Sequence, residues 1–430
     1  QRQMCIRDST GSPQEAPQVV KKFWPGWDPP EKEEQIIVGG RLCKFAHNWK
    51  KMTNNNWILK IVKEGLELDL LETPRGGKPL ERSIPEDKKD LEKEHLRNIQ
   101  VGAVQPCTKK FIEGRTFYSW MFTIPKKDTI EERRPCFNMK KCNEFVAKAH
   151  FKMEGINTVK DLLKPGEWMC KVDITKAYYH VKIHPNSQDL FRYVWKGQHF
   201  RYNSMPYGLT SAPRVFTKLM KEPIKFLRGL GVRVVFYLDD MLIIGKDPQE
   251  TILHTQWLVQ VLSSLGFLMN LQKSILVRTQ KITFLGLMID STKMLLEVPK
   301  DKLKGIKKEA AHFLNHPLTT IRKLASFIGK LTAISPAIPH QPFYTRNLWK
   351  LKNIALRVHR DWEHTVDLTP IFRELQWWKE QAKLWNGKPL HILQPQQVLT
   401  SDASKTGWGG TSQEVETSGF WSMVEREMSN

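Results

Sequence analysis

The sequence predicts an α+β fold in which helices pack on one face of an antiparallel sheet. Two observations carry this prediction. Short runs rich in β-branched and aromatic residues alternate with longer helix-like segments over residues 117–290. At the centre lies VRVVFYLDDMLIIG (232–245), in which two apolar strands flank Asp239 and Asp240. This pattern indicates a hairpin with adjacent carboxylates at its turn.

Composition narrows the class of protein. The chain has 430 residues, enough for two or three domains, and a formal net charge of +22 that favours a polyanionic partner such as nucleic acid. Six scattered cysteines without zinc-ligand spacing indicate reduced, intracellular thiols. We find no signal peptide and no membrane span, because polar residues interrupt the longest uncharged stretch, 251–272. The first and last residues suggest a fragment of a longer protein.

The first hundred residues divide into two parts. Residues 1–34 lack apolar periodicity and are expected to form a disordered tail. Residues 35–100 are expected to form an N-terminal extension, small and ordered up to residue 70. Within it, the charged segment 87–98 predicts an exposed helix whose charges form a solvated face.

A strand over 117–124 runs into a turn and predicts a second hairpin with a basic tip. The tip carries Lys126, Lys127, Arg133 and Arg134. Such side chains pair well with phosphate oxygens, so the tip is either a phosphate clamp or a solvated basic loop.

A third carboxylate lies in the apolar strand 169–174, where Asp173 stands between Val172 and Ile174. Burying an unpaired carboxylate is costly, so Asp173 together with Asp239 and Asp240 favours a site for a hard cation such as Mg²⁺ over a solvated turn. His180 and His184 are interpreted as ordinary sheet residues.

Two helices flank the acidic hairpin along the chain. The first begins near Pro213, ends at Gly229–Gly231 and carries a basic ladder that either follows a nucleic-acid backbone or faces water; its members are Arg214, Lys218, Lys221, Lys225 and Arg228. The second begins at Asp247-Pro248 and ends before Gly266. Short strands are expected around Leu268, Ile275 and Phe284.

The remaining chain is basic and then turns acidic. Residues 310–360 contain eight Lys or Arg and no acid, and they read mainly as helices with an apolar stripe at Leu324, Phe327, Ile328 and Leu331. The charges are a candidate cradle for a nucleic-acid backbone. Further on, a strand leads into Asp402 and a glycine-rich turn.

These segments together resemble a reverse transcriptase. Tyr237-Leu238-Asp239-Asp240 resembles the Tyr-x-Asp-Asp box of that family, and residues 173–178 (DITKAY) resemble its first catalytic motif. Residues 205–213 (MPYGLTSAP) are similar to its substrate-pocket loop, and residues 270–273 and Phe284-Leu285-Gly286 to later motifs, the last being the primer grip. The resemblance implies a right-hand polymerase with fingers, palm and thumb.

The resemblance also implies roles for single residues. Asp173 and Asp239 would bind two Mg²⁺ ions, with Mn²⁺ as the alternative, while Asp240 and the carbonyl of Ile174 would contribute less directly. Lys126 and Arg134 would hold the incoming triphosphate, and Lys273 would protonate the leaving pyrophosphate. Tyr178 would exclude a ribose 2′-hydroxyl, which argues against RNA-directed RNA synthesis. Beside Gly208, Tyr207 replaces the glutamine of retroviral enzymes, so its nucleotide contacts would be packing.

The expected partners are an RNA template, a DNA primer, their RNA·DNA hybrid and deoxynucleoside triphosphates. The expected domains are fingers and palm over 101–297, a basic thumb or connection over 298–392, and the start of a ribonuclease H-like domain over 393–430. Only Asp402 falls on the ribonuclease H pattern, and Glu425 is a poor substitute, so we expect no such activity. Residues 39–42 and 400–410 resemble the reverse transcriptase and ribonuclease H region of DIRS-type retrotransposons. The alternative function is a catalytically inactive, polymerase-derived nucleic-acid-binding protein.

Overall fold

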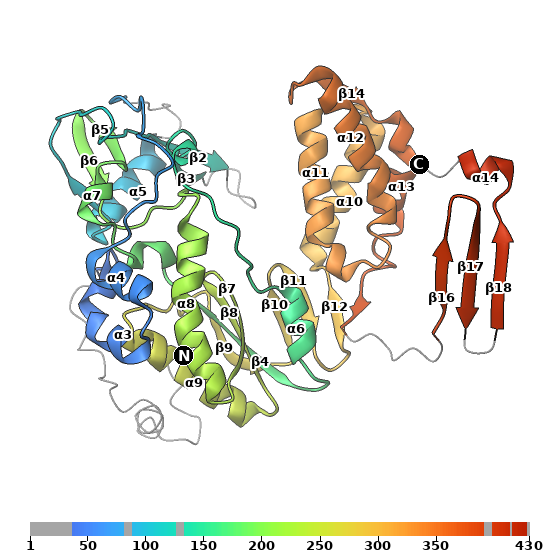
Figure 1. The fold of residues 1–430 in the computed structure, drawn as a ribbon, viewed down its shortest axis with the longest axis horizontal. Coiled ribbons are helices and arrows are strands. Elements are labelled where there is room, and N and C mark those ends of the chain that lie inside the picture. Colours follow the sequence, from blue (N-terminus) through green and yellow to red (C-terminus); the bar gives the residue numbers. More distant parts are fainter. Residues whose placement is uncertain (1–36, 81–87, 126–132, 391–397, 413–414, 428–430) are drawn as a thin grey trace. The chain divides into compact units, whose positions relative to one another are not determined.

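The computed structural model describes residues 37–80, 88–125, 133–390, 398–412 and 415–427 (Figure 1). The predicted tail 1–34 and Lys126 lie outside these residues. The chain forms two compact units, Gln1–Lys388 and Pro389–Asn430, which are considered separately below. No helix in the described ranges combines the length and the apolar character needed to cross a bilayer.

A four-stranded antiparallel sheet, ordered β7-β8-β4-β9, forms the centre of the first unit. Its strands are β4 (Trp168–Asp173), β7 (Arg233–Tyr237), β8 (Asp240–Gly245) and β9 (Ile275–Thr279). The apolar runs on both sides of the acidic turn are buried, which explains why β7 and β8 form where the sequence predicts.

Two helices pack side by side against this sheet, α8 (Ala212–Gly229) and α9 (Pro248–Ser264) (Figure 1). The Asp247 carboxylate accepts a hydrogen bond from the Glu250 amide, and Pro248 occupies the first turn, as expected of a helix start. The α+β prediction is therefore confirmed.

The region between residues 88 and 202 adds a hairpin and a second sheet to the first unit. The hairpin β2–β3 is confirmed, and helix α5 contacts both of its strands. A second sheet is ordered β1-β6-β5. The bounds are α5 (Lys88–Gln100), β1 (Val104–Pro106), β2 (Met121–Pro125), β3 (Arg133–Phe137), η3 (Cys142–Glu144), α6 (Ile156–Leu162), η4 (Ala177–His180), α7 (Pro185–Gln188), β5 (Arg192–Trp195) and β6 (Gln198–Tyr202).

The N-terminal segment packs into the same core as the central sheet. It contains η1 (Arg41–Phe45), α3 (Ala46–Met52) and α4 (Asn56–Glu64). Side chains from it donate to the carbonyls at the end of α9: Asn48 to Ser264 (2.7 Å), Trp49 to Leu265 (2.9 Å) and Arg41 to Gly266 (3.1 Å). These bonds satisfy groups that a helix end leaves without partners.

Helices dominate residues 300–380, as the sequence predicts. The stripe of α11 is fully buried, which confirms it as core. The elements are β10 (Lys281–Phe284), β11 (Leu287–Asp290), β12 (Leu295–Glu297), α10 (Lys300–Asn315), β13 (Leu318–Thr320), α11 (Ile321–Ala333), η5 (Ser335–Ala337), η6 (Phe343–Thr345), α12 (Arg346–His359), β14 (Thr365–Asp367), η7 (Thr369–Ile371), α13 (Phe372–Glu380) and β15 (Lys388–Pro389).

The second unit is a three-stranded antiparallel sheet followed by a short helix. Its elements are β16 (Thr400–Ala403), β17 (Gly407–Ser412), β18 (Val415–Phe420) and α14 (Met423–Glu427). The glycine-rich text is therefore strand β17, and the prediction of a turn there is wrong. The turn lies at residues 404–406 instead, where the Ser404 hydroxyl accepts from the Thr406 and Gly407 amides.

Two further local predictions are wrong. His180 ends the helix η4 and His184 precedes α7, so neither is a sheet residue. No strand forms at Leu268, because its amide donates to His180 Nε2 (3.1 Å) and its carbonyl accepts from the Thr175 amide (2.8 Å). Both backbone groups of Leu268 are thus used by the segment that follows β4.

Candidate active site

The three candidate carboxylates converge at one end of the central sheet. Asp173 ends β4 and Asp240 begins β8, and the two are paired across the strands. Asp239 lies in the turn before β8, after Leu238, whose φ of 55° opens that turn. The Asp239 carbonyl accepts from the Ile174 amide (3.1 Å), which fixes the two acidic segments together.

The electrostatics of the pair Asp173 and Asp239 are those of an unneutralised anionic site. Burial raises the pKa of Asp173 to about 6, and the charges of Asp239 and Asp240 add to the shift, against Lys273 and Lys171. Burial also raises the pKa of Asp239. A bound cation would favour the charged form of both groups.

Asp240 has a protein cation as its partner. Lys171 Nζ lies 2.8 Å from Asp240 Oδ1, and both side chains are about three-quarters buried or more. Sequence reasoning missed Lys171, although a lysine two residues before Asp173 in an apolar strand lies on the same face as that aspartate. The expectation that Asp240 contributes less directly stays a prediction, and this ion pair is consistent with it.

The donor set fits a divalent metal ion in its chemistry. Carboxylate and carbonyl oxygens are the ligands of hard cations, and Asp173, Asp239 and Ile174 supply them from adjoining segments. Within the described ranges no three acidic, histidine or cysteine side chains already stand together as a complete ligand set. The raised pKa of Asp173 is the observation that favours a cation at this point.

A loop after α9 holds the Asp173 backbone from both sides. The Asn270 amide donates to the Asp173 carbonyl (2.7 Å), and the Asp173 amide donates to the Ser274 hydroxyl (3.0 Å). The Ser274 hydroxyl in turn donates to the Asn270 carbonyl (2.7 Å). Sequence reasoning missed Ser274, because a single serine gives no periodic signal. Lys273 lies within this loop.

Two tyrosines form an aromatic platform next to the carboxylates. The Tyr178 ring lies 4.9 Å from Tyr207 and 5.7 Å from Phe216, between centroids. Tyr178 is only 9% exposed, whereas Tyr207 is 42% exposed and faces the pocket. Burial raises the pKa of both hydroxyls, so both are neutral donors at physiological pH.

Gly208 is required by the close approach of the hairpin β2–β3. Its φ is 101°, and a Cβ there would lie 2.8 Å from the Phe137 carbonyl oxygen. Asn143 clamps the same loop, donating to the Gly208 carbonyl (2.8 Å) and accepting from the Thr210 amide (2.9 Å). Asn143 is a second residue that sequence reasoning missed.

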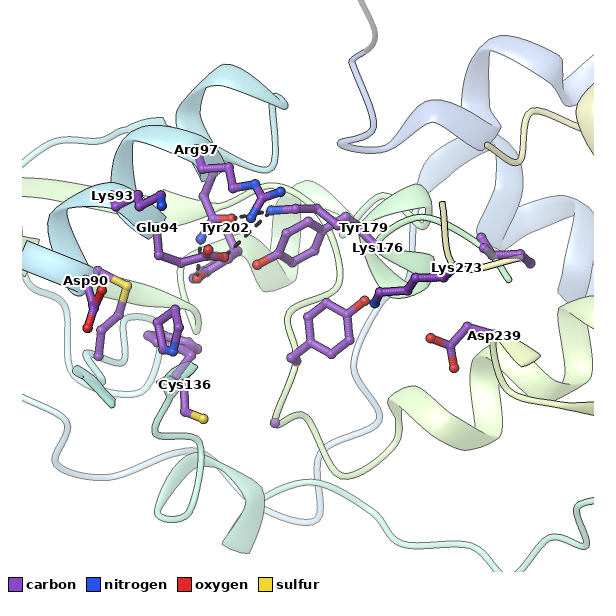
Figure 2. Close-up of a pocket in the computed structure, with 17 residues that line it drawn as sticks. Asp90, Lys93, Glu94, Arg97, Cys136, Lys176, Tyr179, Tyr202, Asp239 and Lys273 are labelled. Atoms are coloured by element: carbon purple, nitrogen blue, oxygen red, sulfur yellow. Dashed lines mark hydrogen bonds and ion pairs between the residues drawn. The ribbon is translucent and has the colours of Figure 1, made fainter. Parts of the chain in front are cut away.

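Several of these groups line one pocket of about 900 Å³ (Figure 2). Asp239 and Lys273 lie on one side, and the α5 side chains Asp90, Lys93 and Glu94 lie on the other. The complete lining is Asp90, Lys93, Glu94, Arg97, Asn98, Met121, Pro135, Cys136, Phe137, Ile174, Lys176, Tyr179, Tyr202, Tyr207, Gly208, Asp239 and Lys273. The pocket is large enough for a nucleotide.

Comparison with known proteins shows which family the central part of the chain is similar to. Residues 124–289 match the family model "Reverse transcriptase (RNA-dependent DNA polymerase)". Residues 124–289 are a reverse transcriptase domain. The enzymatic polyprotein of cauliflower mosaic virus (strain Strasbourg) is 22% identical over 392 residues, and the match covers 88% of this chain and 53% of that protein. The chain thus spans about half the length of that relative.

A second viral polyprotein is similar in sequence, and two solved structures are similar in fold. The Gag-Pol polyprotein of gibbon ape leukemia virus is 26% identical over 274 residues, covering 60% of this chain and 15% of that protein. The foamy viral protease-reverse transcriptase in complex with dsDNA superimposes with a TM-score of 0.62 at 15% identity, covering 99% of this chain and 81% of that one. Its complex with RNA/DNA hybrid gives 0.61 at 14%, covering 99% and 52%. At these identities the likeness shows the fold, into which a layout of fingers, palm and thumb fits.

The reverse transcriptase domain brings together most of the predicted site residues. Asp239, Ile174, Tyr207, Gly208 and Lys273 line the pocket, and Asp173 and Tyr178 lie directly behind this lining. Arg134 lies in β3, next to the lining residue Pro135, and its side chain falls outside the described part of the structure. The family implies use of a divalent metal ion.

The predicted primer grip forms a separate feature of the reverse transcriptase domain. Leu285 and Gly286 have φ of 49° and 76° and connect β10 to β11 by a two-residue turn. Lys302 of α10 donates to the Gly286 carbonyl (2.9 Å), which ties this turn to the first helix of the basic region. Phe284, at the end of β10, is buried.

The predicted ribonuclease H residue lies in the other compact unit, outside the reverse transcriptase domain. Asp402 is exposed in β16, and its carboxylate accepts from the Ala403 amide. Glu425 accepts from the Ser422 amide (2.8 Å) and hydroxyl (2.7 Å) and so serves at the start of α14. The ribonuclease H-like assignment stays a prediction.

Proposed function

We propose that this chain is an RNA-directed DNA polymerase that adds deoxynucleotides to a primer 3′-hydroxyl. One observation carries the proposal. Asp173 and Asp239 converge beside a pocket of about 900 Å³ within a reverse transcriptase domain. A module that only binds nucleic acid gains nothing from converging anions, because they repel phosphates.

Asp173 and Asp239 are the proposed metal ligands, with the Ile174 carbonyl and Asp240 in supporting roles. When bound, two Mg²⁺ ions, or Mn²⁺ in their place, would activate the primer hydroxyl and stabilise the leaving pyrophosphate. The chain orients these ligands through the Asn270 and Ser274 bonds to the Asp173 backbone. It also excludes water from Asp173, which is 7% exposed.

The substrate groups follow from the same pocket. Lys126 and Arg134 would hold the triphosphate, Lys273 at the rim would protonate the leaving group, and Tyr207 would pack on the nucleotide. Tyr178 would stand beneath the sugar and exclude a 2′-hydroxyl. The proximity of Lys273 to both aspartates, whose charged forms it favours, supports its role.

The proposed partners are an RNA template, a DNA primer and the hybrid they form. The foamy viral protease-reverse transcriptase is similar in fold, and its complexes with RNA/DNA hybrid and dsDNA support this proposal. The primer-grip turn at 284–286 and the basic helices α11 and α12 are the proposed contacts. Replication of a retrotransposon of the DIRS type is the proposed context.

Primer extension on an RNA template tests the proposal. With Mg²⁺ and deoxynucleotides, the parent protein should extend a DNA primer, and Asp239→Asn should lose roughly a thousandfold or more in rate, because a lost metal ligand removes several kcal/mol of transition-state stabilisation. Asp161→Asn, an exposed aspartate outside the pocket, is the matched control and should retain parental activity. A folded parent that binds the hybrid without extending it would instead favour the inactive binding protein.

A further inference from the structure

The charged side chains of helix α5 line the pocket, whereas the sequence predicted that they form a solvated face. Asp90, Lys93, Glu94 and Arg97 all line it, opposite Asp239 (Figure 2). The wall therefore carries both charges, and among the described residues neither Lys93 nor Arg97 is held in an ion pair with the acids beside it.

Lys176 projects into the same wall from the segment between Asp173 and Tyr178. Its ammonium lies 3.7 Å from the Glu94 carboxylate, 3.4 Å from the Asn98 side-chain oxygen and 5.2 Å from the Tyr179 ring centroid. The side chain is only 18% exposed. Its backbone is left-handed, with φ 44° and ψ 49°, a conformation that costs energy for a residue with a Cβ. The fold thus maintains a strained lysine at this point.

The ion pair that holds Lys176 is a weak one for a partly buried charge. Burial lowers the pKa of the ammonium, Glu94 raises it, and the neighbouring Arg97 lowers it further. The distance of 3.7 Å is long for a charge-assisted hydrogen bond, whose usual N···O length is about 2.7–2.9 Å. A polyanion in the pocket would therefore be a stronger partner for Lys176 than Glu94 is.

The position of Lys176 fits the path of a nucleotide triphosphate. Under the proposed function, the reacting phosphate lies at Asp173 and Asp239, and the distal phosphates lie toward Arg134. Lys176 follows Asp173 by three residues, and the pocket wall continues through Pro135 to Phe137, directly after Arg134. The distal phosphates would then cross the space between this strand and α5.

We propose that Lys176 binds the distal phosphates of the incoming nucleotide, and that Glu94 holds it in place until nucleotide arrives and then releases it. This inference rests on the proposed function for the identity of the ligand. Lysine binds phosphate as a point charge, and exchanging one carboxylate for a triphosphate increases the attraction. Glu94 is therefore a positioning residue that competes with the substrate.

The test compares variants of Lys176 and Glu94, for which the proposal expects different effects on the KM for deoxynucleotide. Lys176→Met keeps the side-chain length and should raise the KM for deoxynucleotide by roughly tenfold, the order expected for one charge-assisted hydrogen bond, with kcat little changed. Lys176→Arg should restore much of the affinity. Glu94→Gln should lower KM or leave it unchanged, because it frees the lysine.

A matched control comes from a lysine between β5 and β6 that pairs with another acid of the same helix. Lys196 also has a left-handed backbone (φ 48°) and pairs with Glu92 of α5, but neither residue lines the pocket. Lys196→Met should leave KM at the parental value. If Lys176→Met and Glu94→Gln raise KM equally, or if Lys176→Met matches Lys196→Met, Lys176 only anchors α5 and the proposal fails.

Direct binding separates this inference from the proposed function. Calorimetric titration of the full chain with inorganic tripolyphosphate needs no catalysis, and Lys176→Met should weaken binding by roughly tenfold while Glu94→Gln should not weaken it. Lysine-dependent binding without primer extension would support the anion site while overturning the polymerase. Primer extension with tripolyphosphate binding that is indifferent to Lys176 would overturn the anion site alone.

Discussion

Asp173 is a buried carboxylate whose ionisation should lower the free energy of unfolding of the protein. Its pKa is about 6 in the folded protein and 3.8 in a free side chain, so between these values the native state binds more protons than the unfolded state. The free energy of unfolding of the metal-free protein should therefore fall as pH rises from about 4 to above 6, with the stabilising contribution of protonated Asp173 present below 4 and lost through 6.

Asp173→Asn should remove the part of this dependence that Asp173 contributes and leave the smaller part that the raised pKa of Asp239 contributes. At pH 7.5 in the presence of a chelator, the variant should be more stable than the parent by up to about 3 kcal/mol, since one pKa unit corresponds to about 1.4 kcal/mol. Urea unfolding at pH 5 and pH 7.5 measures the difference, with Asp161→Asn as control. A variant whose stability changes with pH as steeply as the parent's would show that Asp173 is not the titrating group.

Tyr178 carries the prediction on sugar selectivity. The ring is held against Tyr207 and Phe216, so it cannot move aside without disturbing Phe216, which is fully buried. Tyr178→Ala should raise ribonucleotide incorporation relative to deoxynucleotide by at least roughly tenfold, whereas Tyr178→Phe, which keeps the ring, should discriminate as the parent does. Single-nucleotide incorporation gives both ratios. An alanine variant that still refuses ribonucleotides would place the selectivity elsewhere.

Among the helices and strands, the sequence predicts those whose formation depends on residues close together in the chain. The hairpins β7–β8 and β2–β3 and the helices α8 and α9 lie where apolar runs, Pro and Gly indicate. The segment at Leu268 was mispredicted because its backbone bonds go to His180 and Thr175, some ninety residues away in sequence. No local pattern contains that information.

Helix α5 illustrates the same limit in another way. Its buried face consists of Leu91, His95 and Asn98, which stand at helical spacing, but only one of them is apolar. His95 contacts the Tyr193 hydroxyl (2.8 Å), and Asn98 donates to the Tyr202 hydroxyl (3.4 Å). A buried face built on polar contacts resembles a solvated face in sequence, so the part that α5 plays in the pocket could not be predicted.

The part of the site that the sequence predicts is its carboxylates, because charged residues are rare in apolar strands. Asp173, Asp239 and Asp240 stand out because burying a carboxylate without a partner costs free energy. Ser274 and Asn143 do not stand out, because each acts through two hydrogen bonds to backbone groups: Ser274 joins Asn270 of its own loop to Asp173 of β4, and Asn143 holds the loop at Gly208 and Thr210. Supporting residues of this kind are visible only once the chain is folded.

For the whole molecule, the N-terminal segment is structural rather than accessory. Residues 37–70 supply eight buried apolar side chains to the first unit: Val38, Leu42, Trp49, Ile58, Ile61, Val62, Leu66 and Leu68. They also supply the donors that complete the end of α9. That helix packs on β8 and β4, the two strands that carry Asp240 and Asp173.

A protein that begins at residue 71 should therefore lose its cooperative fold, and one that begins at residue 37, which keeps these side chains, is the reference for the comparison. At about 1.5–3 kcal/mol for each fully buried apolar side chain, the eight residues match or exceed the whole net stability of a typical protein, about 5–15 kcal/mol. Thermal unfolding followed by circular dichroism compares the two deletions. A cooperative transition at the parental temperature in the shorter protein would show that the central sheet and α9 hold together without this segment, and that the end of the sheet with Asp173 and Asp240 does not depend on it.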